Sequence, residues 1–308
     1  MDVPHLNPAV IAAAAELAGQ FARRDPFRHV VIDDFFAADF LSRLLDDFPA
    51  FERGDARNEA GELGGKSVVE RIRNLGAAYA HLHELIQSPA DLGLISTITG
   101  IPDLLYDPHY FGGGTHENRA GQELDPHVDF NRHPLTGTHR RLNLIVYLNR
   151  QWQDSWGGSL ELHSDPRSAD NRISQVTPLL NRAVIFETTE CSWHGFARIQ
   201  PPRDDISRRS IALYFYSDQR PAEELAAAHS TIYVDRPLPP HLVAGHSLSD
   251  TDVERLRELL ARRDHHLARL YRDCHRLEAE LAQAQALLRA RWLSRIKRAL
   301  LGYSRRNQ

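Results

Sequence analysis

Three side chains in this sequence have the types and spacing of metal ligands. The segment DPHVDFN places His127 and Asp129 two residues apart, and His194 follows in CSWHGF. Side chains two apart on a β-strand project from the same face, so the first two can hold one ion. Two imidazoles and one carboxylate on one side of an octahedral ion leave positions open, which suits non-haem Fe(II), whereas structural zinc takes four closed ligands. The three residues predict a catalytic metal site.

A second His-x-Asp triplet, His163-Ser164-Asp165, competes for this assignment. It runs into the turn-rich PRSADNR and leaves room for one strand before His194. After His127 the order is strand, Gly-Gly turn, strand, strand and then His194, which can return the chain to the same end of an antiparallel sandwich. We therefore interpret the second triplet as a chance match.

The segment ISRRSIALYFY supplies a candidate anion ligand. Strand alternation puts Arg208 and Ser210 on one face and Arg209 on the other. A guanidinium among apolar side chains needs an anion, and its two-pronged geometry suits a dicarboxylate whose other end chelates the metal. Ser210 can donate a second hydrogen bond to that carboxylate. The alternative register, with Arg209 facing inward, stays open from the sequence alone.

The elements that must position these residues are short strands. The runs LNLIVYLN, SLELH, AVIFET and SIALYFY are separated by Gly, Pro, Asn and Asp clusters, which predicts a mainly β core, a sandwich or jelly roll, over residues 101–220. Residues 1–100 are mainly helical in pattern, with one short strand in HVVIDDFF, and are expected to form a supporting region. We expect a linker over 221–248.

Residues 249–308 predict a long C-terminal helix. Apolar residues recur there at alternating steps of three and four, which is typical of a coiled coil and predicts a homodimer; the alternative is a long helix packed on its own domain. The seam consists of Val253, Leu256, Leu260, Leu267, Leu270, Cys274, Leu277, Leu281, Ala284 and Leu288. The final segment, RARWLSRIKRALLGYSRR, is basic and amphipathic, which suits peripheral contact with the inner membrane face; the alternative is that its apolar residues close the end of the coiled coil.

Composition limits the partners and the compartment. A net charge of -4 and a pI near 6.5 give no overall attraction to nucleic acid, and none is expected as a partner. Two cysteines far apart argue against a disulfide framework and fit a reducing cytoplasm. The N-terminus lacks a signal-peptide pattern, and no apolar run approaches the roughly 20 residues that span a bilayer. We expect a cytoplasmic protein.

From about residue 106 to 216 the sequence resembles the 2-oxoglutarate and Fe(II)-dependent dioxygenase superfamily, specifically its prolyl 4-hydroxylase-like bacterial branch. His127, Asp129 and His194 match the family's iron ligands, and Arg208-x-Ser210 matches its Arg-x-Ser cosubstrate motif. Tyr147 matches a strand tyrosine that reaches the cosubstrate carboxylate in relatives. The glycine pair at 157–158 matches a family turn. The resemblance implies a double-stranded β-helix core.

The resemblance also implies an activity. The chain would hydroxylate an unidentified substrate with Fe(II) and 2-oxoglutarate, releasing succinate and CO2, with ascorbate as a candidate reductant. Substrate candidates are a protein side chain, an amino acid, or a glycan or lipid intermediate. Two alternatives stay open: a cupin-type metal enzyme that does not use 2-oxoglutarate, and an inactive coiled-coil adaptor. The first has no need for Arg208, and the second has no reason to keep the whole set of residues.

Overall fold

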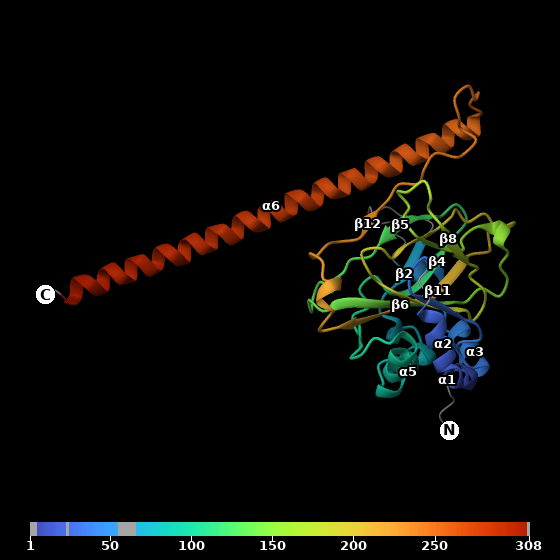
Figure 1. Ribbon diagram of the computed structural model, residues 1–308, viewed down its shortest axis with the longest axis horizontal. Coiled ribbons are helices and arrows are strands. Elements are labelled where there is room, and N and C mark those ends of the chain that lie inside the picture. The colour runs from blue at the N-terminus through green and yellow to red at the C-terminus, as the bar shows by residue number, and fades with distance from the viewer. Residues whose placement is uncertain (1–4, 23–24, 55–65, 307–308) are drawn as a thin grey trace. The chain divides into compact units, whose positions relative to one another are not determined.

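The computed structural model describes residues 5–22, 25–54 and 66–306, with side chains described up to residue 290. The chain divides into two compact units, Met1–Arg236 and Pro237–Gln308, and each is described by itself. The first unit holds a β-rich core with the N-terminal helices on one side of it (Figure 1). The second contains one long helix.

Among the described residues, five α-helices lie within the first hundred positions, interspersed with two short strands. They are α1 (Pro8–Ala12), α2 (Ala14–Phe21), α3 (Ala38–Asp46), α4 (Ala77–Ile86) and α5 (Pro89–Thr99), and short 3-10 turns lie at Phe51–Arg53 and Ile72–Asn74. Helix α5 shows why its boundaries lie where they do. The Ser88 side chain accepts from the Asp91 backbone N–H at its start, Pro89 takes the first turn, and Gly100 ends it with φ of 69°.

The larger of two antiparallel sheets has seven strands. Its order is β1-β9-β6-β11-β4-β2, and β3 pairs with β11. Their bounds are β1 (His29–Ile32), β2 (Lys66–Val69), β3 (Leu105–Tyr106), β4 (Gly114–Asn118), β6 (His139–Tyr147), β9 (Ala183–Glu187) and β11 (Arg208–Ser217).

The smaller sheet has five strands in the order β12-β5-β10-β7-β8. Their bounds are β5 (Leu124–Val128), β7 (Leu160–His163), β8 (Ile173–Val176), β10 (Trp193–Phe196) and β12 (Ile232–Tyr233). Further 3-10 turns lie at Asp154–Trp156 and Ala222–Glu224.

Strand alternation gives the large sheet two different faces. On β6, Leu142, Leu144 and Val146 join the core shared with the N-terminal helices, whereas Tyr147 belongs to a second apolar cluster with Leu160 of β7. The two sheets therefore pack face to face, and the helices cover the outer face of the larger one. This arrangement leaves the inner face of β6 and β11 to line a site between the sheets.

Two expected domain boundaries need correction. The N-terminal region 1–100 is not only a helical support, because β1 pairs with β9 and β2 pairs with β4, so both belong to the large sheet. Residues 221–236, expected as the start of a linker, instead pack on the core through β12, which pairs with β5. Residues 237–249 separate Arg236 from helix α6.

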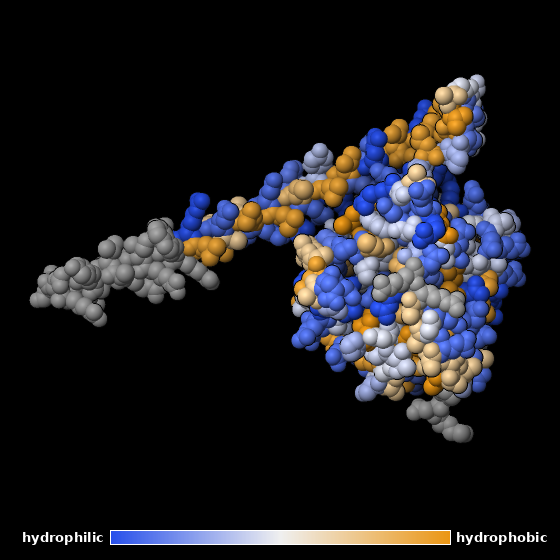
Figure 2. Space-filling view, viewed as in Figure 1, coloured by the Kyte–Doolittle hydropathy of each residue, from blue (hydrophilic) through white to orange (hydrophobic). Residues whose placement is uncertain are grey.

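Helix α6 (Asp250–Arg306) forms most of the second unit. It begins with a capping box, in which the Asp252 carboxylate accepts from the Ser249 backbone N–H at 2.9 Å and the Ser249 hydroxyl accepts from the Asp252 N–H at 3.2 Å. Apolar side chains form a line along this helix in Figure 2. The seam leucines from Leu260 to Leu288 are 45–64% exposed. The coiled coil and the homodimer stay predictions.

The expected membrane contact involves Trp292 and the basic residues after it, whose side chains lie outside the described residues. In the described part of the chain, no helix has both the length and the hydropathy that crossing a membrane requires. Peripheral contact through the C-terminal segment therefore stays a prediction.

Candidate metal centre

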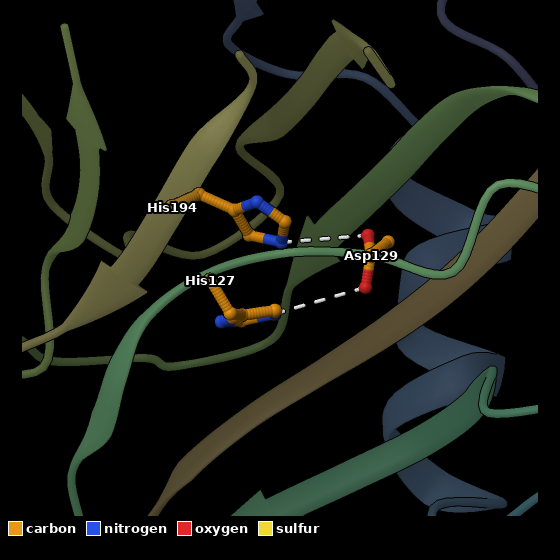
Figure 3. Close-up of side chains that lie close together, drawn as sticks. All are labelled: His127, Asp129 and His194. Atoms are coloured by element: carbon orange, nitrogen blue, oxygen red, sulfur yellow. Dashed lines mark ion pairs between the residues drawn. The ribbon is translucent and has the colours of Figure 1, made fainter. Parts of the chain in front are cut away.

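The three predicted metal ligands converge at one end of the small sheet (Figure 3). His127 lies on β5 and His194 on β10, and the antiparallel register makes them direct cross-strand partners with ring centroids 4.2 Å apart. Asp129 follows β5 and places its carboxylate oxygens 3.7 Å from His127 Nε2 and 3.5 Å from His194 Nε2. One ligand atom from each residue lies within 4.8 Å of the others. Figure 3 shows both imidazoles directed toward the carboxylate.

Backbone carbonyls orient both imidazoles. His127 Nδ1 lies 2.9 Å from the Asp125 carbonyl oxygen, and His194 Nδ1 lies 2.9 Å from that of Ser192. Each Nδ1–H therefore donates to the backbone, which leaves the Nε2 lone pair directed at the common centre. Protein ligands to metals are usually held in this way by a hydrogen bond on the other ring nitrogen.

The charges of the three groups suit a divalent cation. Burial, together with the neighbouring His194, lowers the pKa of His127 to about 3, and burial also lowers the pKa of His194. Burial alone would raise the pKa of the Asp129 carboxyl, but Arg140 and the two histidines outweigh it and the net shift is downward. At neutral pH the site therefore presents two neutral imidazoles and one carboxylate, the donor set that Fe(II) takes in oxygenases.

Two residues that the sequence did not reveal as functional hold the Asp129 carboxylate. Arg140 Nη2 lies 3.0 Å from Asp129 Oδ2, and Asn143 Nδ2 donates to the same oxygen at 2.8 Å. The Arg140 guanidinium is itself fixed between the rings of Phe130 and Tyr214, 4.4 and 3.7 Å from their centroids. Since both donors bind Oδ2, they leave Oδ1 as the oxygen that is available to a metal.

The predicted anion ligand lies inside the molecule. Arg208 is buried, its Nε donates to the Gly158 carbonyl at 2.6 Å, and its Nη2 donates to the Tyr147 hydroxyl at 3.2 Å. Ser210 is the direct cross-strand partner of Tyr147 and lines a cavity together with Arg208. In the described part of the chain no carboxylate lies within ion-pair distance of Arg208. Burial lowers the pKa of the Arg208 guanidinium, and Tyr147 partly offsets the effect.

The glycine pair 157–158 makes room for Arg208. Both glycines have positive φ, 67° and 69°, which side-chain-bearing residues rarely adopt. A Cβ on Gly158 would also lie 2.9 Å from Trp152 and 3.3 Å from Arg208 Cδ. The turn therefore needs glycine so that its carbonyl can approach the guanidinium.

The other arginine of the pair, Arg209, points to the opposite face of β11. Its Nη2 donates to Glu117 at 3.1 Å, and its side chain is 44% exposed. The sequence left open which of the two arginines faces inward. In the structure Arg208 lies inside and Arg209 lies outside.

The second His-x-Asp triplet does not join the centre. His163 lies on β7 and contacts Asn171 at 2.9 Å and Glu161 at 3.5 Å. Among the described residues, Asp165 belongs to no group of converging metal-ligand side chains. The interpretation of this triplet as a chance match agrees with the geometry.

A cavity of about 400 Å³ connects the candidate metal ligands with Arg208. Its wall includes His127, Asp129, His194 and Arg208, together with His116 of β4 and Thr231 and Tyr233 at β12. The buried His116 Nε2 has no hydrogen-bond partner among the described residues. Sequence reasoning missed His116 and Tyr233, because neither belongs to a motif with recognisable spacing.

Comparison with known proteins agrees with this geometry. Residues 113–216 match the model of the 2OG-Fe(II) oxygenase superfamily. The chain is 26% identical over 113 residues to the prolyl 3-hydroxylase OGFOD1 of Mus musculus, covering 35% of this chain and 19% of that protein. The chain thus spans about a fifth of the length of this relative.

Solved structures of two prolyl 4-hydroxylases also resemble the chain. The enzyme from Phytophthora capsici is 18% identical with a TM-score of 0.49, covering 86% of this chain and 77% of that one. The enzyme from Pseudomonas putida is 18% identical with a TM-score of 0.39, covering 70% and 97%. The matched segment 113–216 contains the three metal-ligand candidates, Tyr147, Arg208 and Ser210. Residues 113–216, about a third of the chain, are therefore similar to the 2OG-Fe(II) oxygenase superfamily.

Proposed function

We propose that this protein is an Fe(II)- and 2-oxoglutarate-dependent dioxygenase that hydroxylates a substrate and releases succinate and CO2. One observation carries the proposal. The two-histidine, one-carboxylate centre and the buried Arg208, which has no carboxylate partner among the described residues, line the same cavity. A dicarboxylate that chelates a metal at one end and binds a guanidinium at the other would use both.

Different residues of the chain would bind the metal and the cosubstrate. His127, Asp129 and His194 would hold Fe(II) on one side and leave its remaining positions to cosubstrate and oxygen. Arg208 would bind the distal carboxylate of 2-oxoglutarate in a two-pronged pair, with the Tyr147 and Ser210 hydroxyls as further donors. Bound Fe(II) and 2-oxoglutarate would supply the oxidising chemistry, in which decarboxylation is coupled to insertion of oxygen.

Arg208 is the residue that separates this proposal from its alternatives. Burying a cation without an anion is costly, so a guanidinium with only neutral partners favours a carboxylate ligand. A cupin-type metal enzyme without 2-oxoglutarate would not need it. An inactive adaptor would need neither Arg208 nor the hydrogen bonds that orient both imidazoles.

Part of the cavity wall is apolar, which suits an oxidative reaction from which water must be excluded. Leu124, Ile145, Leu160 and Phe196 contribute apolar surface beside the metal ligands. Apolar walls limit the access of water to a reactive centre. We further propose that the two facing sheets form the double-stranded β-helix that the sequence resemblance implies.

Binding of 2-oxoglutarate tests the proposal. Calorimetric titration of the Mn(II)-loaded protein should show one site for 2-oxoglutarate. Glutarate has both carboxylates but lacks the keto oxygen, and it should bind more weakly because it cannot chelate the metal. Equal affinity for the two ligands, or no binding of either, would contradict the proposed function.

The substrate itself needs a separate experiment. Cell extract would be incubated with the protein, Fe(II), 2-oxoglutarate and ascorbate, and searched by mass spectrometry for molecules that gain one oxygen atom. The matched control is the His127→Ala variant, which should produce none of them. A product that forms equally with both proteins is not made at this centre.

A further inference from the structure

A segment beyond the matched family region lies against the metal centre. Residues 225–236, here called the strap, follow the last strand of the large sheet and run antiparallel to β5. Ile232 pairs with Val128 and Tyr233 pairs with His127, and the Val234 N–H donates to the Pro126 carbonyl at 2.8 Å. The strap therefore adds an edge strand directly beside the strand that carries a metal-ligand candidate.

Asn131 fixes the first end of the strap. Its Oδ1 accepts from the His229 backbone N–H at 3.1 Å, and its Nδ2 donates to the Ala227 carbonyl at 2.8 Å. The Glu190 carboxylate also lies 3.0 Å from Nε2 of the His229 ring. Asn131 lies two residues after Asp129, so this anchor holds the strap at the end of the metal-ligand segment.

Arg236 fixes the other end. It donates to the Glu161 carboxylate at 2.8 Å and to the Leu124 carbonyl at 3.0 Å, and it lies 3.6 Å from both Glu123 and Asp125. The side chains of these three acidic residues are only 2–6% exposed. A guanidinium among buried carboxylates is held strongly, because its removal would leave charges buried without it.

Between these anchors, Tyr233 covers the His127 imidazole. The two rings lie 5.3 Å apart between centroids and are tilted by 31°, and Tyr233 also forms part of the cavity wall. The Asp125 carbonyl fixes the same imidazole through Nδ1. The carboxylate of Asp125 in turn faces Arg236. The strap therefore contacts His127 directly through Tyr233, and its second anchor contacts Asp125, the residue that orients the same imidazole.

We propose that the strap is a positioning element of the metal centre. Tyr233 restricts rotation of the His127 imidazole and closes this side of the cavity, and Asn131 and Arg236 hold the strap in place. This inference rests on the proposed function, because it assigns Tyr233 a role toward a metal bound by His127. It adds residues outside the segment 113–216 to the site.

The experiment measures the affinity of the full-length protein for Co(II) alone, by absorption and calorimetry. Tyr233→Ala should weaken binding by about 2- to 10-fold, the size expected for the loss of one aromatic contact. Tyr233→Phe keeps the ring and should remain within about 2-fold of the unmodified protein. The matched control is Tyr271→Ala on α6, where the tyrosine is 66% exposed, and its affinity should not change.

Hydrogen exchange tests the anchor independently of any metal. Arg236→Gln should accelerate amide exchange in the strap, including Val234, relative to the control Arg203→Gln, which alters an exposed ion pair with Asp205. Equal exchange in both variants would overturn the role of Arg236. Thermal unfolding of each variant establishes that the core is intact.

The outcomes for the strap and for the proposed function are distinguishable. Co(II) binding that depends on His127 but is unchanged by Tyr233→Ala overturns the strap inference and leaves the proposed function standing. A loss that is as large with Tyr233→Phe as with Tyr233→Ala overturns the role of the ring. Co(II) binding that His127→Ala does not reduce contradicts both.

Discussion

Asn143 donates through Nδ2 to Oδ2 of Asp129 at 2.8 Å, the same oxygen that faces the guanidinium of Arg140. The Asn143 Oδ1 in turn accepts from Arg140 at 2.7 Å, so the three side chains form a closed hydrogen-bonded group. The carboxylate therefore cannot rotate without losing two donors. This group fixes the orientation of the Asp129 carboxylate, whose Oδ1 lies 3.7 Å from His127 Nε2 and whose Oδ2 lies 3.5 Å from His194 Nε2, the two candidate metal ligands.

Loss of the Asn143 amide should weaken metal binding. Outer partners of metal ligands typically contribute about 10- to 100-fold in affinity, and Asn143→Ala should reduce Co(II) affinity by that order. Calorimetry measures the change, with Gln151→Ala at an exposed position as the control. An affinity within about 2-fold of the unmodified protein would show that Arg140 alone is sufficient.

The two neighbouring arginines should respond differently to truncation. Removing one partner of a buried charge pair costs about 3 to 5 kcal/mol, which corresponds to roughly two to three and a half decades in affinity. Arg208→Ala should weaken 2-oxoglutarate binding by that order, whereas Arg209→Ala should have a small effect, since Arg209 faces Glu117 outside the cavity. Calorimetric titration ranks them, and the reverse ranking would reject Arg208 as the anchor.

The half-buried His116, whose Nε2 atom is buried, should make stability depend on pH. Burial, with the charge of Lys66, lowers its pKa from 6.5 to about 3. Between these values the unfolded chain binds a proton that the folded protein does not, so the free energy of unfolding rises with pH and falls on acidification. His116→Gln should reduce the slope of the unfolding free energy against pH by an amount that corresponds to about one bound proton. Urea unfolding at several pH values measures the slope, and identical slopes would contradict the prediction.

Disulfide formation at Cys274 can test the predicted coiled coil. In a parallel, in-register dimer, the two copies of this seam residue would face each other and form a disulfide under mild oxidation. The crosslink should persist in Cys191→Ser and disappear in Cys274→Ser. A chain truncated after Ala244 should be monomeric by light scattering. A monomeric full-length protein would leave a long helix without a coiled-coil partner.

Much of the candidate site could be predicted from the sequence, because side chains alternate between the two faces of a short strand. This alternation placed Arg208 and Ser210 on the inner face of β11 and Arg209 on the other, as the structure has them. The order of strands after His127 also anticipated the return of His194, since antiparallel pairing makes the two histidines cross-strand partners.

Other parts of the site could not be predicted because they depend on tertiary irregularities. The pairing of β6 with β11 shifts between Phe215 and Tyr216, so Arg140 points inward where strict alternation would select Arg141. Strand β12 has only two residues, and its position depends on Arg236 and Asn131. A period of two residues cannot be recognised in so short an element, so the strap was expected to be a linker.

Formation of succinate from 2-oxoglutarate tests the central claim most directly. With 2-oxoglutarate, Fe(II), oxygen and ascorbate, the purified protein should produce succinate. Production should occur both with and without the hydroxylation substrate, and the rates under the two conditions should differ. His127→Ala should abolish production by removing a metal ligand, whereas His163→Ala, which alters the competing triplet on β7, should remain active. Succinate formation that survives His127→Ala, or that is lost in His163→Ala with the fold intact, would contradict the assignment of the metal centre.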